Sequence, residues 1–329
     1  MEEPVSRRGW VLFALMSVLW GIPYLMIKVA VEGGISVPVL VFARTALGAA
    51  VLLPLVVRRG AGGPGAGGLG TLRRHWRPIL AFAALEILGP WALLSDAERH
   101  LSSSMTGLLI AAVPIAGLVL ARLLETWERA RGKETAGTGE RLGPARWAGL
   151  LLGLGGVGVL AAPHLEGGSA WAIGEIMLVV LGYSIAPMIA ARRLGEVPSL
   201  QMTVACLTLA ALVYAAPAAA TWPESMPDGT VLAALAGLGI VCTALAFVVF
   251  FELIREVGTS RAMVFTYVNP AVAVAAGVLF LDEPLTGTIA AAFVLILCGS
   301  VLATGSRRRP GLPPEPERRS EEVRAEPHA

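Results

Sequence analysis

The chain has 329 residues, of which 55% are hydrophobic and 15% are charged, and its formal net charge is +2. A soluble domain carries about 25% charged residues, and its outer shell must be polar. This composition excludes a soluble cytosolic enzyme and a disordered chain. It predicts an all-α polytopic membrane protein, because lipid cannot satisfy an open peptide backbone.

Ten apolar segments follow one another along the chain, and each is long enough for a membrane-crossing helix, which takes about 20 residues. They are 10–31, 38–57, 78–95, 103–121, 144–162, 170–191, 199–219, 229–251, 260–281 and 286–304. Residues 1–9 precede the first segment, and the charged, proline-rich residues 305–329 follow the last. We expect both to be cytoplasmic and the tail to be disordered.

Lysine and arginine collect on one side of this predicted topology. With the N-terminus inside, the inside loops and the tail hold 23 of the 26 basic residues, and the outside loops hold one, Arg99. The other two, Lys28 and Arg44, lie within spans. Cytoplasmic loops are enriched in Lys and Arg. The bias therefore supports ten spans in the plasma membrane with both termini in the cytoplasm.

The two halves of the chain resemble each other. Residues 106–114 (TGLLIAAVP) match 262–270 (AMVFTYVNP), and residues 157–162 (VGVLAA) match 299–304 (GSVLAT). We interpret 10–162 and 163–304 as two repeats of five helices each. Because five is odd, the second repeat would be inverted in the membrane, which is an arrangement typical of transporters. The alternative is a chance likeness between two helices rich in leucine and alanine.

Three ionisable residues of the predicted spans are candidates for a site, because charge in a membrane is costly and usually faces a cavity or a partner. Glu86 is a candidate for proton coupling or solute contact, and the alternative is a structural ion pair with Arg44 or Lys28. Arg44 would bind an anionic group of a solute, or it is a fixed partner of Glu86 or a carbonyl. Lys28 lies near the outer end of its span, where it would either contribute to the site or reach toward the bilayer surface.

Aromatic and amide side chains supply the remaining candidates for a solute site. The first span places Trp20, Tyr24 and Lys28 at helical spacing on one face, as a solute site or ordinary helix packing would. Tyr183 precedes a proline in the sixth span, and Tyr267 and Asn269 precede one in the ninth. Five prolines would break helices and permit gating motion, or they are static kinks: Pro23, Pro90, Pro114, Pro187 and Pro270.

Other motifs do not point to catalysis. Residues 153–158 match a dinucleotide-binding pattern, but they lie within an apolar span without a preceding strand, so helix packing explains the glycines. Neither the histidines nor the cysteines have metal-site spacing. We expect no catalytic residue, metal or cofactor, and no nucleic-acid partner. Without a nucleotide-binding motif, a gradient of protons or solute would drive any transport.

These residues resemble the EamA-type branch of the drug/metabolite transporter superfamily. The resemblance rests on Trp20-Gly21 before Pro23 and Lys28, on Arg44, on Pro114, and on Asn269-Pro270 followed by Glu283. It covers about residues 10–305. In the first half, Trp127 stands where the second half has Glu283, with Glu125 and Glu128 on either side.

The resemblance implies a ten-helix, inverted-repeat transporter with a central solute site. We expect a secondary active transporter that exports a small metabolite, amino acid or drug-like solute by alternating access, with protons as the coupling ion. The alternative is a channel or a non-transporting membrane component. The expected partners are the solute and the lipid bilayer, and a homodimer is left open.

Overall fold

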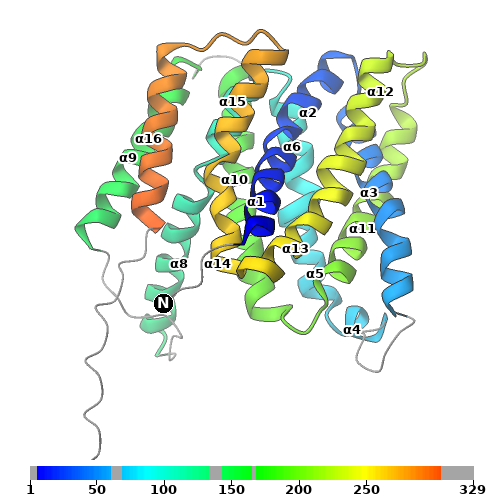
Figure 1. The fold of residues 1–329 in the computed structure, drawn as a ribbon, viewed down its shortest axis with the longest axis horizontal. Helices are drawn as coiled ribbons and strands as arrows, with labels where there is room; N and C mark the ends of the chain where they lie inside the picture. The colour runs from blue at the N-terminus through cyan, green and yellow to red at the C-terminus, as the bar shows by residue number, and fades with distance from the viewer. Residues whose placement is uncertain (1–5, 61–68, 133–142, 165–167, 305–329) are drawn as a thin grey trace, which may run out of the picture.

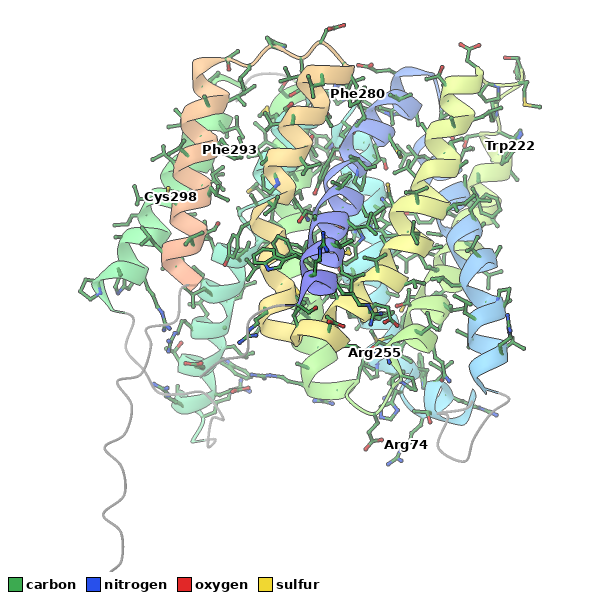
Figure 2. The ribbon with its side chains drawn as sticks, in the orientation of Figure 1. Arg74, Trp222, Arg255, Phe280, Phe293 and Cys298 are labelled. Atoms are coloured by element: carbon green, nitrogen blue, oxygen red, sulfur yellow. The ribbon has the colours of Figure 1, made fainter. Side chains whose placement is uncertain are left out.

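The computed structural model describes residues 6–60, 69–132, 143–164 and 168–304, and these residues form helices joined by loops, with no β-strand among them. The helices stand side by side in one bundle (Figure 1). We call the end where α1 begins the N-terminal end; it carries Arg74 and Arg255 (Figure 2). The opposite end, called the far end, carries Trp222 and Phe280 (Figure 2). The predicted tail at 305–329 lies outside the described residues.

The first half of the bundle contains helices that are frequently interrupted. They are α1 (Arg7–Gly21), α2 (Pro23–Glu32), α3 (Val37–Gly60), α4 (Leu69–Arg74), α5 (Trp76–Ala83), the π-helix η1 (Ala84–Leu88), α6 (Gly89–Ala97), α7 (Ser103–Ile110), α8 (Val113–Ala130), α9 (Pro144–Ala161) and the short 3₁₀ turn η2 (Ala162–His164).

The second half repeats this interrupted pattern. Its helices are α10 (Gly168–Arg193), α11 (Ser199–Ala220), α12 (Gly229–Ala236), the π-helix η3 (Gly237–Leu245), α13 (Ala246–Val257), α14 (Thr259–Ala262), the 3₁₀ helix η4 (Met263–Tyr267), α15 (Asn269–Phe280) and α16 (Gly287–Thr304).

Eight helical segments of the described chain are long and apolar enough to cross a membrane. They coincide with the first eight predicted spans and together run from Arg7 to Val257. The last two predicted spans fall on the shorter apolar helices Asn269–Phe280 and Gly287–Ala303. The ninth is short because η4 and Val268 interrupt the helix before Pro270. The all-helical membrane fold is thus confirmed, and ten crossings remain a prediction.

Most of the predicted helix breaks occur where expected. Pro23, Pro90, Pro114 and Pro270 each stand in the first turn of a helix that follows an interruption. Proline is suited to the first turn of a helix, because the N–H that it lacks would have no carbonyl partner within the helix there. Pro187 differs from the others, because it lies inside the continuous helix α10.

The fourth and ninth predicted spans, which correspond in the two halves, run antiparallel where they meet. Gly107 of α7 lies against Ala273 of α15, and Ser104, nearer the start of α7, lies against Gly277, nearer the end of α15. The π-helices η1 and η3 also occupy corresponding places, each ahead of the last part of the third predicted span of its half. The third and fourth spans of each half therefore carry interruptions in corresponding places, whereas the break between α1 and α2 has no counterpart in the continuous helix α10.

Close packing of glycines joins α9 to α16 at the edge of the bundle (Figure 1). A methyl group added at Gly149 or Gly299 would overlap backbone atoms of the opposite helix. Gly153, from the dinucleotide-like pattern, packs against Ile115 and Gly299. The pattern therefore serves helix packing.

Candidate functional site

A cavity of about 1000 Å³ lies in the middle of the bundle and takes its lining from both halves. Seven of the eight predicted solute-site residues line it: Trp20, Tyr24, Arg44, Glu86, Tyr183, Tyr267 and Asn269. Four of the five predicted helix-breaking prolines also line it: Pro23, Pro114, Pro187 and Pro270. The structure thus collects residues that are up to about 250 positions apart in the sequence into a single cavity with the size of a ligand pocket.

Arg44 supplies a fixed positive charge to this cavity. Its guanidinium carbon lies 3.6 Å from the centre of the Trp91 ring, and its Nε donates a hydrogen bond of 3.1 Å to Thr243 Oγ1. The π-helix η3 presents Thr243, whose hydroxyl donates to the carbonyl of Leu238. Stacking and one hydrogen bond hold the planar group in place. Its two terminal nitrogens have no hydrogen-bond partner among the described residues and are available to an anion.

Glu86 supplies a carboxyl group from the π-helix η1. A π-helical turn widens the backbone and is frequently found at functional sites. The Glu86 Oε2 atom is buried and has no hydrogen-bond partner in the described part of the protein. No ion pair joins Glu86 to Arg44 or Lys28 among the described residues, so the structural-pair alternative finds no support. Tyr214 steadies the end of η1 by donating to the Leu88 carbonyl at 2.8 Å.

Aromatic residues form one wall of the cavity. The Trp20 ring centre lies 5.1–5.7 Å from the ring centres of Phe247, Phe250 and Phe265. This packing fixes the Trp20 ring and connects α1 to α13 and η4. Ser184, beside Tyr183 in the lining, donates to the Val113 carbonyl at the start of α8. The lining therefore combines apolar rings with polar tips, as a pocket for a small solute requires.

Asn269 stands at the break between η4 and α15. With its amide oriented by the surrounding hydrogen bonds, its nitrogen donates to the Phe265 carbonyl at 3.1 Å and to the Ser17 carbonyl at 3.2 Å. Pro270 cannot donate to the carbonyl four residues earlier. The Asn269 side chain therefore bonds the Phe265 carbonyl at this break, and its bond to the Ser17 carbonyl connects the break to α1.

Lys28 does not line the cavity. Its Nζ donates to the carbonyls of Glu98 at 2.8 Å and Leu101 at 3.0 Å, and it pairs with Glu32 at 3.2 Å. Lys28 thus connects α2 to the loop between α6 and α7. The sequence did not single out the buried Glu98 in that loop, because it lies just beyond the predicted span 78–95.

Glu283 closes the far end of the bundle across the repeats. Its two carboxylate oxygens accept hydrogen bonds from the backbone amides of Ser103 at 2.7 Å and Ser104 at 2.9 Å. These amides belong to the first turn of α7, where a negative charge is favourable. Gly277 of α15 lets the contact form, since an added methyl there would overlap Glu283 Oε2 and Ser104 Oγ.

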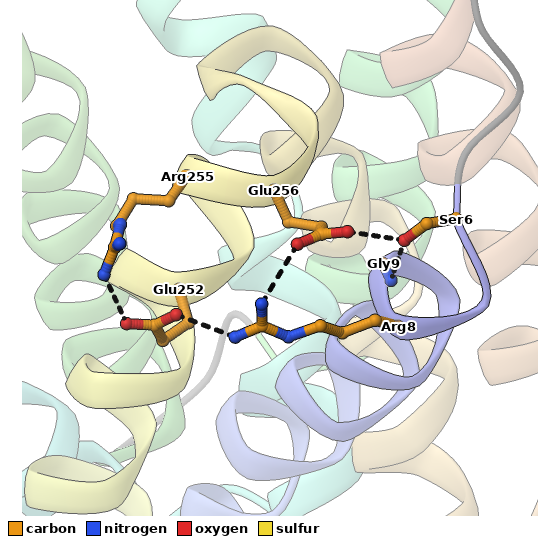
Figure 3. Close-up of polar contacts among 6 residues, drawn as sticks. All are labelled: Ser6, Arg8, Gly9, Glu252, Arg255 and Glu256. Carbon is orange, nitrogen blue, oxygen red and sulfur yellow. Dashed lines mark hydrogen bonds and ion pairs between the residues drawn. The ribbon is translucent and has the colours of Figure 1, made fainter.

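The N-terminal end has a different set of contacts, which Figure 3 shows. Arg8 at the start of α1 pairs with Glu252 at 3.0 Å and Glu256 at 3.4 Å, both from α13. Ser6 donates to Glu256 at 2.6 Å. These contacts connect α1 to α13. α7 and α15 pack closely at the far end, whereas any contact between α8 and α14 is slight by comparison.

Comparison with known proteins agrees with the architecture. The model of the EamA-like transporter family matches residues 7–129 and 170–305. Uncharacterized transporter YvbV of Bacillus subtilis (strain 168) is 24% identical, over 90% of this chain and 92% of its own. Uncharacterized inner membrane transporter YedA of Escherichia coli (strain K12) is 26% identical, over 88% of this chain and 90% of its own.

A solved structure, titled only as the crystal structure of a protein, has a similar fold. It aligns with a TM-score of 0.63 and 21% sequence identity, over 90% of this chain and 96% of its own. The two family matches together span most of the chain and fall on its two halves. The protein is therefore a multi-pass membrane protein that belongs to the EamA-like transporter family.

Proposed function

We propose that this protein is a secondary active transporter that exports a small solute across the plasma membrane by alternating access. The observation that carries the proposal is the central cavity, in which Arg44, Glu86 and four aromatic residues from both repeats converge. No group of three or more His, Cys, Asp or Glu residues among the described ones could hold a metal ion.

The topology that we propose has ten crossings in two inverted repeats. α14, η4 and α15 form the ninth crossing and α16 forms the tenth. The antiparallel course of α7 and α15 supports the inversion, and the family has two repeats. The concentration of basic residues at the N-terminal end supports a cytoplasmic location for that end.

The contacts at the two ends support a state that is open toward the N-terminal end. At the far end α7 packs on α15 and Glu283 bonds the start of α7. At the N-terminal end the cavity lining continues to Gly117, Met263 and Val264. Met263 is 43% and Val264 46% exposed. In the proposed orientation, a solute would enter this state from the cytoplasm.

The charges of the cavity favour a zwitterionic solute, such as one that carries a carboxylate and an amine. The terminal nitrogens of Arg44 would bind the anionic group. Glu86 would bind the amine or, in the empty transporter, a proton, because an unpaired carboxylate within the membrane is costly. Competition between amine and proton for Glu86 would couple solute export to proton entry.

Proteoliposomes that contain a pH-sensitive dye test this proposal. Purified protein is reconstituted and challenged with pools of amino acids, other metabolites and organic cations. We expect a zwitterionic pool to change the internal pH in protein-containing liposomes and not in empty ones. Ohmic single-channel conductance without saturable flux would instead identify a channel and contradict the proposal.

A further inference from the structure

The far end of the bundle contains a buried acid that the central cavity does not use. Glu98 caps the end of α6 and is fully buried, and both of its carboxylate oxygens lack a hydrogen-bond partner in the described structure. A buried carboxylate without a hydrogen bond or a counter-charge in contact is strongly unfavourable. The group must therefore bind something that removes its charge.

Lys28 is near Glu98 but does not neutralise it by direct contact. Two N–H groups of its ammonium donate to the Glu98 and Leu101 carbonyls, and the third faces Glu32. An ammonium has three N–H donors, so none remains for the Glu98 carboxyl. Lys28 binds the backbone of Glu98 and leaves its side chain unpaired.

The other titratable and charged groups around Glu98 come from its own segment and from four further elements. Tyr24, Lys28 and Glu32 belong to α2, Arg44 to α3, and Glu283 to the loop after α15. Asp96, Arg99 and His100 belong to its own segment, and Glu175 of α10 faces Asp96. Burial raises the pKa of the Glu98 carboxyl well above its ordinary value; Lys28 and Arg44 oppose this rise, and Glu283 and Glu32 add to it.

We propose that Glu98 is a proton-binding site, separate from the solute cavity, whose protonation keeps the far end of the bundle closed. The neutral Glu98 side chain lies beside α2 and adds no second negative charge near Glu283. When the far end opens, water would reach Glu98 and the proton would leave to the solution on that side. The inference rests on the alternating access proposed above, but it concerns a gate and not the solute.

The sign of the pH effect follows from this arrangement. Closed protein binds the proton more tightly than open protein, in which a hydrated Glu98 has an ordinary pKa of about 4.3. Below that value both states are protonated and the closed end is at its most stable. As the pH rises from there toward the raised pKa of the closed state, the ratio of closed to open protein falls by about tenfold per pH unit.

Distance measurements between two spin labels test the inference without any solute. Labels are attached at His100→Cys and Leu285→Cys, which lie on the two far-end loops, after the three native cysteines are replaced by alanine. Both side chains are exposed, and removing His100 also removes a competing titratable group. Double electron–electron resonance then measures the closed and open populations of the full chain in nanodiscs between about pH 5 and about pH 9.

Three further variants make the result decisive. Gly277→Ala is added to the labelled protein because its methyl group weakens the Glu283 contact and brings both populations into the measurable range. We expect the open fraction to rise with pH in this protein, and Glu98→Gln to abolish the dependence and keep the end closed. Glu224→Gln, which changes an exposed acid in the loop after α11 at the same end, should retain the full dependence.

The opposite results would overturn the inference. An equal pH dependence with and without Glu98→Gln, or no dependence in the Gly277→Ala protein, would show that Glu98 binds no proton linked to closure. A response to Na⁺ at constant pH that Glu98→Gln removes would assign the site to a metal cation instead.

If Glu98→Gln does not fold, infrared spectra of the Gly277→Ala protein replace it. Their protonated-carboxyl band must then decline with rising pH in step with opening. Transport could still occur in each case, so failure here is distinct from failure of the proposed function.

Discussion

The guanidinium of Arg44 lies over the ring of Trp91, with its central carbon 3.6 Å from the ring centre. Trp91 belongs to α6 and Arg44 to α3, so the contact joins two helices at the wall of the cavity. A stack of this kind fixes the plane of the guanidinium while its edge remains available for hydrogen bonds. This relationship leads to a prediction about solute affinity.

Arg44→Lys should weaken the binding of solutes that carry an anionic group. Lysine retains the charge but loses both the stacking and the paired terminal nitrogens. We expect KM for such a solute to rise by about tenfold or more, which corresponds to about 1.4 kcal/mol. Arg122→Lys, at an ion pair with Glu125 outside the cavity, is the matched control and should leave KM unchanged. An unchanged KM in Arg44→Lys would exclude Arg44 from solute binding.

Glu86→Gln should uncouple solute movement from proton movement. Glutamine fits the same π-helical turn but cannot exchange a proton. We expect solute-driven proton flux to fall by about tenfold or more, while the variant elutes from size exclusion like the parent protein. Glu175→Gln removes a different buried carboxyl and should retain the flux. Normal proton flux in Glu86→Gln would remove Glu86 from the mechanism.

Gly277→Ala should destabilise the state described here. Its methyl group overlaps Glu283 Oε2 and Ser104 Oγ, and relief of such crowding typically costs about 1–3 kcal/mol. We expect the Tm in detergent to fall. Gly174→Ala on α10 is a matched control because open space surrounds its added methyl. A Tm for Gly277→Ala equal to that of Gly174→Ala would show that the contact between α7 and α15 tolerates extra volume.

Pro270→Ala should slow transport more than it weakens solute binding. The substitution restores an N–H that can bond the Thr266 carbonyl and extends α15 back through the break. We expect the maximal rate to fall about fivefold while KM changes less, because the motion of the helix is affected and not the charges. Pro217→Ala removes a proline from α11, which does not line the cavity, and serves as the control. Uptake as fast as the parent's in Pro270→Ala would mean that Pro270 is a static kink.

The sequence contained enough information to predict the membrane fold and several of the polar and aromatic residues that line the cavity. Hydrophobic length identified the helices, and the cost of polar groups in lipid singled out Glu86 and Arg44. The same reasoning places Lys28 in the site, but the structure places it at the far end with Glu98 and Leu101. Pro90 likewise does not line the cavity.

Other features depend on contacts that a single sequence does not reveal. The position of Trp91 against Arg44, and of Thr243 beside it, follows from how α6 and η3 pack on α3. Glu98 has the appearance of a loop residue, because only the packing of α2 and of the loop that carries Glu283 buries it. A break at Pro270 in the ninth span was predicted, but the 3₁₀ helix η4 that precedes it was not.

The shared lining of the cavity has a consequence for the origin of the protein. Tyr24, Arg44 and Glu86 come from one repeat, and Tyr183, Tyr267 and Asn269 come from the other. Neither repeat alone encloses a site. In the proposed inverted topology, a single-repeat ancestor would enclose such a site only as a pair of identical chains in opposite orientations. The present chain takes both Arg44 and Glu86 from its first repeat, so its two halves are not equivalent in the site.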